Sequence, residues 1–433
     1  MKKLLYIASI MTLCLLIMNG CPRRAPATVT EIEPEVPKPP AIKPVVNVYV
    51  ENTASMDGFV NGPTDFKIAV YGYLADMQVA NIAESINLFY INNKTTMFNG
   101  DIRDFIERLD PKTFASRRQL NVDTDIANVM KMIVDDMDEH TLSILAADCI
   151  FSAGSNKSSA EYLGNQQIGI FRNIAEHITK YPNTAFVIYR LTSQFDGRYF
   201  NRDNKAQVIQ KGRLPYFMWI IGNVDDIATF KEKIPQAHFK GSGITHSYTL
   251  LPMVHEVNYA VQHTPKIGNF NFGKTRKHIV KPKKETKRGG NQGKFMFSIG
   301  VNFSNLQTLL GNDYICNPDN YSLTVNRQLS DAFDLEIVEN KGKTSYSHIL
   351  KLSTTDRIPT GDVEITLINK VPEWIDEKND EIGLDILAPD AMDKTYGIKN
   401  MIAGIVDAYN RVFKETQETH QPYAKINVNI SNR

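Results

Sequence analysis

The pattern of apolar and polar positions changes at about residue 45 of the chain. Beyond it, short apolar runs typical of β-strands alternate with stretches in which apolar residues recur every three or four positions, as on one face of a helix. The apolar runs lie at 45–50, 88–91, 142–147, 185–191 and 216–221. The helical stretches lie at 66–77, 102–109, 122–137, 168–178 and 227–234. This alternation predicts an α/β domain over residues 45–236, with a doubly wound, mostly parallel sheet and helices on both faces.

The alternation stops after residue 236. Residues 237–294 lack a clear period, and their second half, 274–294, holds nine Lys and Arg residues against the single acid Glu285. We expect a solvated basic loop or linker there, with contact to anionic lipid headgroups or to an acidic partner as the alternative. Residues 295–433 show short strand-like runs separated by turn residues and one long amphipathic stretch between 398 and 412. They predict a β-rich C-terminal domain with one long helix.

The first residues have the pattern of an export signal. Lys2 and Lys3 precede an apolar run from Leu4 to Met18, which predicts a signal peptide over residues 1–20, with a membrane anchor as the alternative. The following Gly20-Cys21 pair resembles a bacterial lipobox, which implies a lipid on Cys21 and a location in the bacterial cell envelope, either periplasmic or surface-exposed. Residues 21–44 are rich in Pro and predict a semi-rigid tether.

The overall charge bears on nucleic-acid binding, and the cysteine content bears on disulfide bonds. Lys and Arg number 49 against 48 Asp and Glu, so the overall charge gives no reason to expect nucleic-acid binding. Without the signal peptide and Cys21, only Cys149 and Cys316 remain. One possible pair does not make a disulfide framework, and a buried free Cys149 is as compatible with the sequence as a bridge.

Hydroxyl and carboxylate side chains follow the predicted strands. Glu51, Thr53 and Ser55 come directly after the first strand, Asp148 follows the strand at 142–147, and Thr124 stands at the start of a helix. In a parallel sheet these positions can share one edge, where α/β domains bind ligands. Oxygen ligands of this kind suit Mg²⁺ or Mn²⁺. The alternative is that the hydroxyls cap helices and tie loops together without a cation.

This order of residues resembles the von Willebrand factor type A domain and its metal-ion-dependent adhesion site. That family places Asp-x-Ser-x-Ser after the first strand, a Thr before a later helix and an Asp after the fourth strand. The segment ENTAS at 51–55 matches the first element, Thr124 the second and Asp148 the third. Two residues depart from the pattern, because Glu51 stands in place of Asp and Thr53 in place of Ser. The resemblance implies one divalent cation, completed by an Asp or Glu carboxylate of a protein partner.

The sequence thus favours a lipid-anchored envelope protein that binds a protein partner through a cation. It predicts no enzyme, because no G-x-S-x-G nucleophile elbow and no dinucleotide-binding fingerprint occur. Residues 268–275 match the phosphate-binding pattern G-x-x-x-x-G-K-T but lack the strand and helix that must frame it. Two alternatives stay open: a metal-free structural or assembly component of the envelope, and a metal-dependent phosphoester hydrolase.

Overall fold

The computed structural model describes residues 42–117, 125–154, 158–252, 254–342, 344–413 and 422–433. The expected signal peptide, Cys21 and most of the tether fall in residues 1–41 and lie outside the described residues, as does Thr124. Within the described part of the chain, no helix combines the length and the apolar character needed to cross a membrane.

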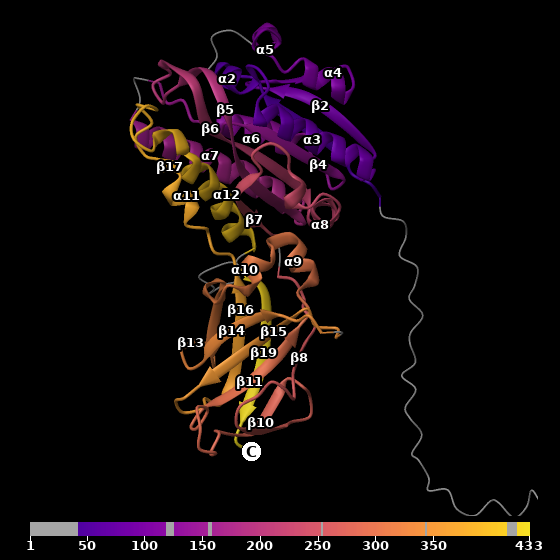
Figure 1. The fold of residues 1–433 in the computed structure, drawn as a ribbon, viewed down its shortest axis with the longest axis vertical. Coiled ribbons are helices and arrows are strands. Elements are labelled where there is room, and N and C mark those ends of the chain that lie inside the picture. Colours follow the sequence, from indigo (N-terminus) through magenta and orange to yellow (C-terminus); the bar gives the residue numbers. More distant parts are fainter. Residues whose placement is uncertain (1–41, 118–124, 155–157, 253, 343, 414–421) are drawn as a thin grey trace, which may run out of the picture. The chain divides into compact units, whose positions relative to one another are not determined.

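The first sheet has seven strands in the order β3-β2-β1-β4-β6-β5-β7 (Figure 1). They are β1 (Val45–Glu51), β2 (Ser85–Ile91), β3 (Thr95–Met97), β4 (Thr141–Ala147), β5 (Thr184–Phe200), β6 (Ala206–Asn223) and β7 (Ile244–Leu250). β1 is central and runs parallel to both β2 and β4. β4 is buried along its whole length, as its apolar sequence predicts for a central strand.

The expected parallel arrangement holds for β2, β1 and β4, but the sheet as a whole is mixed. β6 pairs antiparallel with both β4 and β5, and β7 pairs antiparallel with β5. Only residues 201–205 separate β5 from β6, whereas a parallel crossover needs roughly a dozen residues or more. The chain therefore turns back in a hairpin, and β6 occupies the place beside β4.

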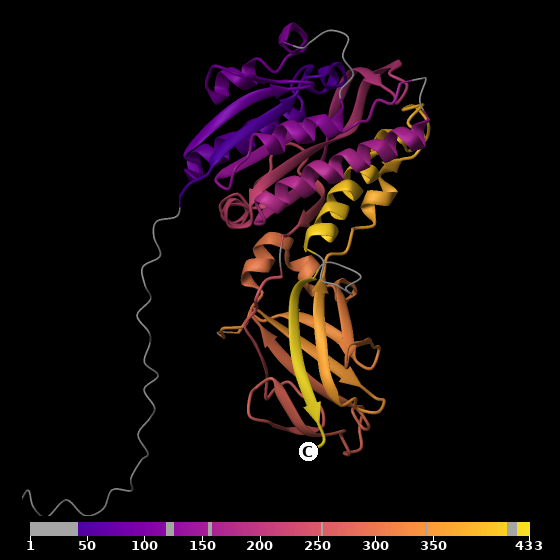
Figure 2. The ribbon, with the colours of Figure 1, turned by 180° about the vertical axis from the view of Figure 1, so that it is seen from behind.

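Helices cover both faces of this sheet, as expected (Figures 1 and 2). Successive strand residues point to opposite faces, so Val48 shares one apolar core with α3 and α8, while Tyr49 shares the other with α6 and α7. These helices are α3 (Asp65–Ala80), α6 (Ile126–Asp135), α7 (Ser159–Lys180) and α8 (Val224–Lys233). Shorter elements of this part are η1 (Ala54–Met56), α2 (Asp57–Val60), α4 (Ile102–Glu107) and α5 (Pro111–Arg117).

The long helix near the C-terminus, α12 (Ile398–Phe413), completes the α/β part of the chain. Figure 2 shows it beside α7, and Ile405 of α12 shares an apolar core with Ile174 of α7. The helices approach closely at Gly404, where a Cβ would lie 2.7 Å from the carbonyl oxygen of Gln167. The long helix that the sequence predicts for the C-terminal domain is therefore present as α12. It packs on the α/β domain, which the sequence predicts over residues 45–236.

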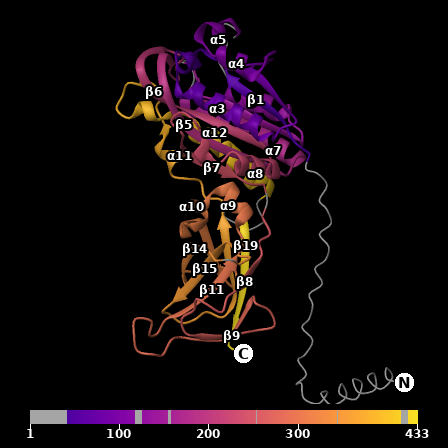
Figure 3. The same cartoon turned by 45° about the vertical axis from the view of Figure 1, so that its right-hand side comes forward.

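Apart from the short pair β17 and β18, which form a two-stranded sheet of their own, the remaining strands form two sheets around one apolar core (Figure 3). Their orders are β13-β12-β16-β19-β10-β9 and β14-β15-β11-β8. The strands are β8 (Tyr259–Val261), β9 (Asn269–Phe272), β10 (His278–Lys283), β11 (Phe295–Val301), β12 (Tyr321–Val325), β13 (Gln328–Leu329), β14 (Asp334–Glu339), β15 (His348–Thr354), β16 (Gly361–Ile368) and β19 (Pro422–Ser431). Short elements between them are α9 (Ser304–Leu310), α10 (Asn312–Cys316), η3 (Pro318–Asn320), α11 (Trp374–Glu377), β17 (Asn379–Asp380), η4 (Ala391–Asp393) and β18 (Thr395–Tyr396).

Residues 237–294, expected as a basic loop or linker, hold four strands instead. β7 joins the first sheet, while β8, β9 and β10 belong to the β-rich part. In β10, Ile279 is fully buried, whereas Lys281 and Lys283 are exposed. The strand is irregular, because its register with β9 shifts between Val280 and Lys283 and Lys281 has a left-handed φ of 53°. The sequence therefore carries no regular alternation of apolar and polar residues that would mark β10.

Candidate polar site at the ends of β1 and β4

Two carboxylates come together where β1 and β4 end. Glu51 is the last residue of β1, and Asp148 directly follows the last residue of β4. The two strands are parallel neighbours with Val50 beside Ala146, so both acids lie at the same edge of the sheet. Glu51 is 3% exposed and Asp148 1% exposed. Two acidic side chains are therefore almost completely removed from water at one place.

The hydroxyls of Thr53 and Ser55 lie beside these carboxylates. The two hydroxyl oxygens are 2.8 Å apart and share a hydrogen bond. Thr53 also hydrogen-bonds to Glu51, and Ser55 hydrogen-bonds to Asp148. Both hydroxyl side chains are half-buried. The structure thus brings four of the five expected site residues together, and the fifth, Thr124, lies outside the described residues.

Burial and mutual repulsion disfavour ionisation of the two acids. Burial raises the pKa of Glu51 well above its ordinary value, and the negative charge of Asp148 raises it further. Burial also raises the pKa of Asp148, against hydrogen bonds from Ser55 and from the backbone N–H of Ile150, the latter at 3.1 Å from Oδ1. Two neighbouring carboxylic acids do not both ionise at low cost, because their negative charges repel each other. The pair therefore requires either a proton or a cation.

One oxygen of each carboxylate lacks a hydrogen-bond donor among the residues that the structure describes. Glu51 Oε2 and Asp148 Oδ2 are buried and accept no hydrogen bond from any residue that the structure describes. Among those residues, no group of three or more His, Cys, Asp or Glu side chains could hold a metal ion. A cation here would depend on two carboxylates together with hydroxyl oxygens. That all-oxygen set suits a hard divalent cation.

The sequence did not indicate two further neighbours of the acids, Cys149 and Tyr199. Cys149 has a left-handed backbone, with φ of 57°, and its sulfur accepts a hydrogen bond from Trp219 Nε1 at 3.3 Å. Burial, followed by the charge of Glu51, raises the pKa of its thiol. Burial also raises the pKa of Tyr199, and Asp148 adds to this increase. Tyr199 reaches the site through the β5–β6 hairpin, a pairing for which the sequence carries no short-range signal.

Comparison of the chain with models of protein families and with curated proteins gave no match. The assignment of a function therefore rests on the geometry of the residues.

Proposed function

We propose that Glu51, Thr53, Ser55 and Asp148 hold a divalent cation, Mg²⁺ or Mn²⁺, through which the chain binds a protein partner. The observation that carries this proposal is the pair of buried oxygens, Glu51 Oε2 and Asp148 Oδ2, which lack a donor among the described residues. Burying a charged group without a partner is costly, and a cation would neutralise both acids. The half-buried hydroxyls of Thr53 and Ser55 would give it access to solvent.

The resemblance to the von Willebrand factor type A domain supports the same proposal. The order of Glu51, Thr53, Ser55 and Asp148 follows that family's adhesion site, with Thr124 as the fifth group. When bound, the cation would supply a coordination position for a partner's Asp or Glu carboxylate, and the chain's own residues would hold it in place. We propose no catalytic step. Lipidation of Cys21 would anchor the protein in the bacterial envelope, where the partner would be met.

A metal-free structural or assembly component is the second candidate. One observation favours it: antiparallel β6 lies beside β4, where the proposed family has a parallel strand. A proton shared by Glu51 and Asp148 would also remove the repulsion between their charges. In this case the sheet edge serves as a scaffold, and contacts with partners are made elsewhere on the chain.

Thermal unfolding of the full chain with Mg²⁺ or Mn²⁺, compared with chelator, separates the two candidates. A ligand that binds only the folded state stabilises it, by about 2.7 kcal/mol at a hundred times its Kd. We expect both the unfolding temperature and the stability to rise. Asp148→Asn should abolish the rise, whereas Glu107→Gln, which removes an exposed acid on α4, should preserve it. An unchanged unfolding temperature at saturating metal would refute the cation.

Partner capture tests the second half of the proposal. The full chain is used as bait in an extract of its own envelope, with and without chelator, alongside Asp148→Ala. Loss of the same partner with chelator and with the folded Asp148→Ala variant supports a metal-bridged contact. Capture that is unaffected by either change supports the metal-free component.

A further inference from the structure

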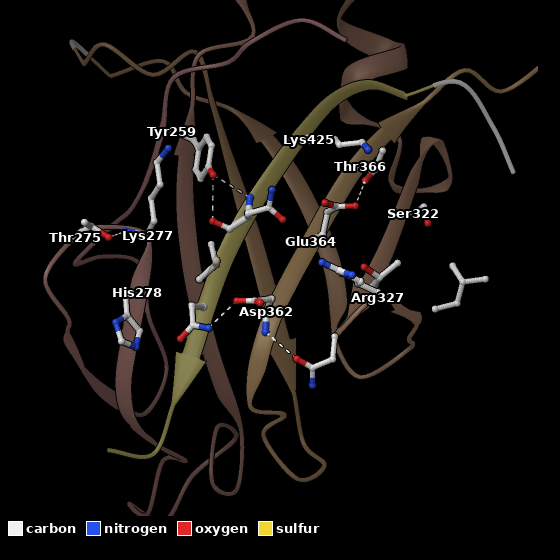
Figure 4. Close-up of a pocket in the computed structure, with 16 residues that line it drawn as sticks. Tyr259, Thr275, Lys277, His278, Ser322, Arg327, Asp362, Glu364, Thr366 and Lys425 are labelled. Carbon is white, nitrogen blue, oxygen red and sulfur yellow. Dashed lines mark hydrogen bonds between the residues drawn. The ribbon is translucent and has the colours of Figure 1, made fainter. Parts of the chain in front are cut away.

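The outer face of the six-stranded sheet in the β-rich part is hollowed into an open groove. Its volume is about 1110 Å³ (Figure 4). Along β16, Val363, Ile365 and Leu367 are buried in the core, while the alternate residues Asp362, Glu364 and Thr366 line the groove. The strand period of two thus places the polar set on this face.

Strand register arranges the polar side chains of this face in rows. Ser322 of β12, Thr366 of β16 and Lys425 of β19 lie side by side, as do Thr324, Glu364 and Asn427, and then Asp362, Asn429 and His278. Asn429 Nδ2 donates to Asp362 Oδ1 at 2.7 Å. Each row therefore offers both donors and acceptors. Among the described residues that line the groove, Leu329 and Val428 are the aliphatic ones and Tyr259 is the aromatic one.

The turn between β12 and β13 places a positively charged side chain, Arg327, at the edge of the groove. Asn326 and Arg327 have φ of 52° and 67°, as in two-residue hairpin turns that favour Asn-Gly, so an Arg occupies the position that suits Gly. The Asn326 side chain accepts a hydrogen bond from the Asp362 N–H and donates one to the Thr360 carbonyl, each at 3.1 Å. The hairpin is thereby fixed to β16, and Arg327 lines the groove opposite Tyr259 and Lys277 (Figure 4).

We propose that this groove binds an oligosaccharide. Sugar hydroxyls both donate and accept hydrogen bonds, which matches rows of Ser, Thr, Asn, Asp and Glu. An apolar ligand would remove water from this polar face without replacing the hydrogen bonds that the water makes. A polyanion would meet Asp362 and Glu364 beside Lys277, Arg327 and Lys425, and like charges next to a ligand disfavour it. The groove is also open, which suits a chain more than an enclosed small molecule.

Isothermal titration of the full chain tests the proposal. The probes are hexasaccharides of N-acetylglucosamine and of glucose, with polyphosphate and a hexamer of galacturonic acid as polyanions. Arg327→Gly removes the guanidinium and leaves a residue that suits the left-handed turn. Its matched control is Lys281→Gly, because Lys281 is an exposed base with φ of 53° that does not line the groove.

We expect at least one hexasaccharide to bind. Arg327→Gly should weaken its binding at least about tenfold, the effect of losing one charged hydrogen bond, while Lys281→Gly leaves it within about twofold. Glu364→Gln should weaken sugar binding through the loss of an acceptor, whereas it would tighten the binding of a polyanion. The proposal is overturned if no hexasaccharide binds, if Arg327→Gly and Lys281→Gly have equal effects, or if Glu364→Gln tightens binding.

Discussion

Glu51 and Asp148 are buried carboxylates at the ends of two neighbouring parallel strands, and each keeps one oxygen without a donor in the described part of the chain. Because the pKa of Glu51 is raised in the folded protein, the folded state binds its proton more tightly than the unfolded state does. The stability from this group is fully present below the unfolded pKa and is lost as pH rises through the folded one.

Glu51→Gln should therefore reduce the pH dependence of stability measured in chelator. Gln keeps the shape of the protonated acid and cannot ionise. At pH 8 we expect the variant to be more stable than the wild type by about 1 to 3 kcal/mol, the cost of a buried polar group without a partner. Denaturant unfolding at pH 5 and pH 8 provides the comparison. A Glu51→Gln variant that loses stability with rising pH as steeply as the wild type would contradict this assignment.

Glu51→Asp tests the residue at which the proposed site differs from the pattern of the von Willebrand factor type A domain, the family that it resembles. If the cluster holds a cation, the shorter carboxylate should lower the Mn²⁺ concentration at which half of the thermal stabilisation is reached, because Asp is the family's ligand there. If no cation binds, the variant only leaves unfilled space and loses about 1 kcal/mol with no response to metal. Titration of Mn²⁺ followed by thermal unfolding distinguishes these outcomes, and Asp148→Asn serves as the unresponsive control.

His177 should make the folded state sensitive to acid. It is 6% exposed, its Nε2 lies 3.2 Å from Thr184 Oγ1, and burial lowers its pKa from 6.5 to about 4. Below pH 6.5 the unfolded state binds a proton that the folded state excludes, so stability falls between pH 6.5 and 4, by about 3 kcal/mol in total. The free energy of unfolding, measured in denaturant at several pH values, should fall less steeply between pH 6.5 and pH 4 for His177→Gln than for the wild type. The prediction fails if His177→Gln loses stability between pH 6.5 and pH 4 as steeply as the wild type does.

The contact between α7 and α12 provides a matched pair of glycine substitutions. Gly404→Ala places a methyl group 2.7 Å from the Gln167 carbonyl oxygen, so the helices must separate, at a cost of about 1 to 3 kcal/mol. Gly164→Ala in α7 meets nothing within 4 Å and should stabilise the helix by about 0.5 to 1 kcal/mol. Chemical denaturation measures both variants. Equal effects of the same sign would refute close packing at Gly404.

The local pattern predicted the elements better than their partners. The apolar run ending before Asp148 is β4, and the stripe from Phe66 to Met77 is α3. A strand buried on both faces is a continuous apolar run, and a helix buried on one face repeats its apolar residues every three or four positions. The proximity of Glu51 and Asp148 could be foreseen because Glu51 ends one strand of the parallel part and Asp148 directly follows another. The pairing of β6 with β4 could not be foreseen, because the pattern of a strand shows its burial and does not show which distant strand lies beside it.

The position of α12 was hidden for a related reason. Its apolar face is evident in the sequence, but its partner Ile174 lies more than 200 residues before Ile405, and a helical period does not say which surface the face covers. The sequence does not reveal β10, because Ile279 is its single buried residue and the irregular backbone at Lys281 breaks the alternation typical of a strand.

The return of the chain through α12 also affects the order in which the protein can fold as it is made. The seventh strand of the first sheet ends at Leu250, yet Ile405, which covers Ile174, is synthesised far later. At roughly 5 to 20 residues per second, that interval lasts roughly 8 to 31 s. During this time the apolar side chains of α7 that α12 will cover are exposed on the nascent chain. A chaperone that covers these side chains until translation is almost complete would protect the newly synthesised protein from aggregation.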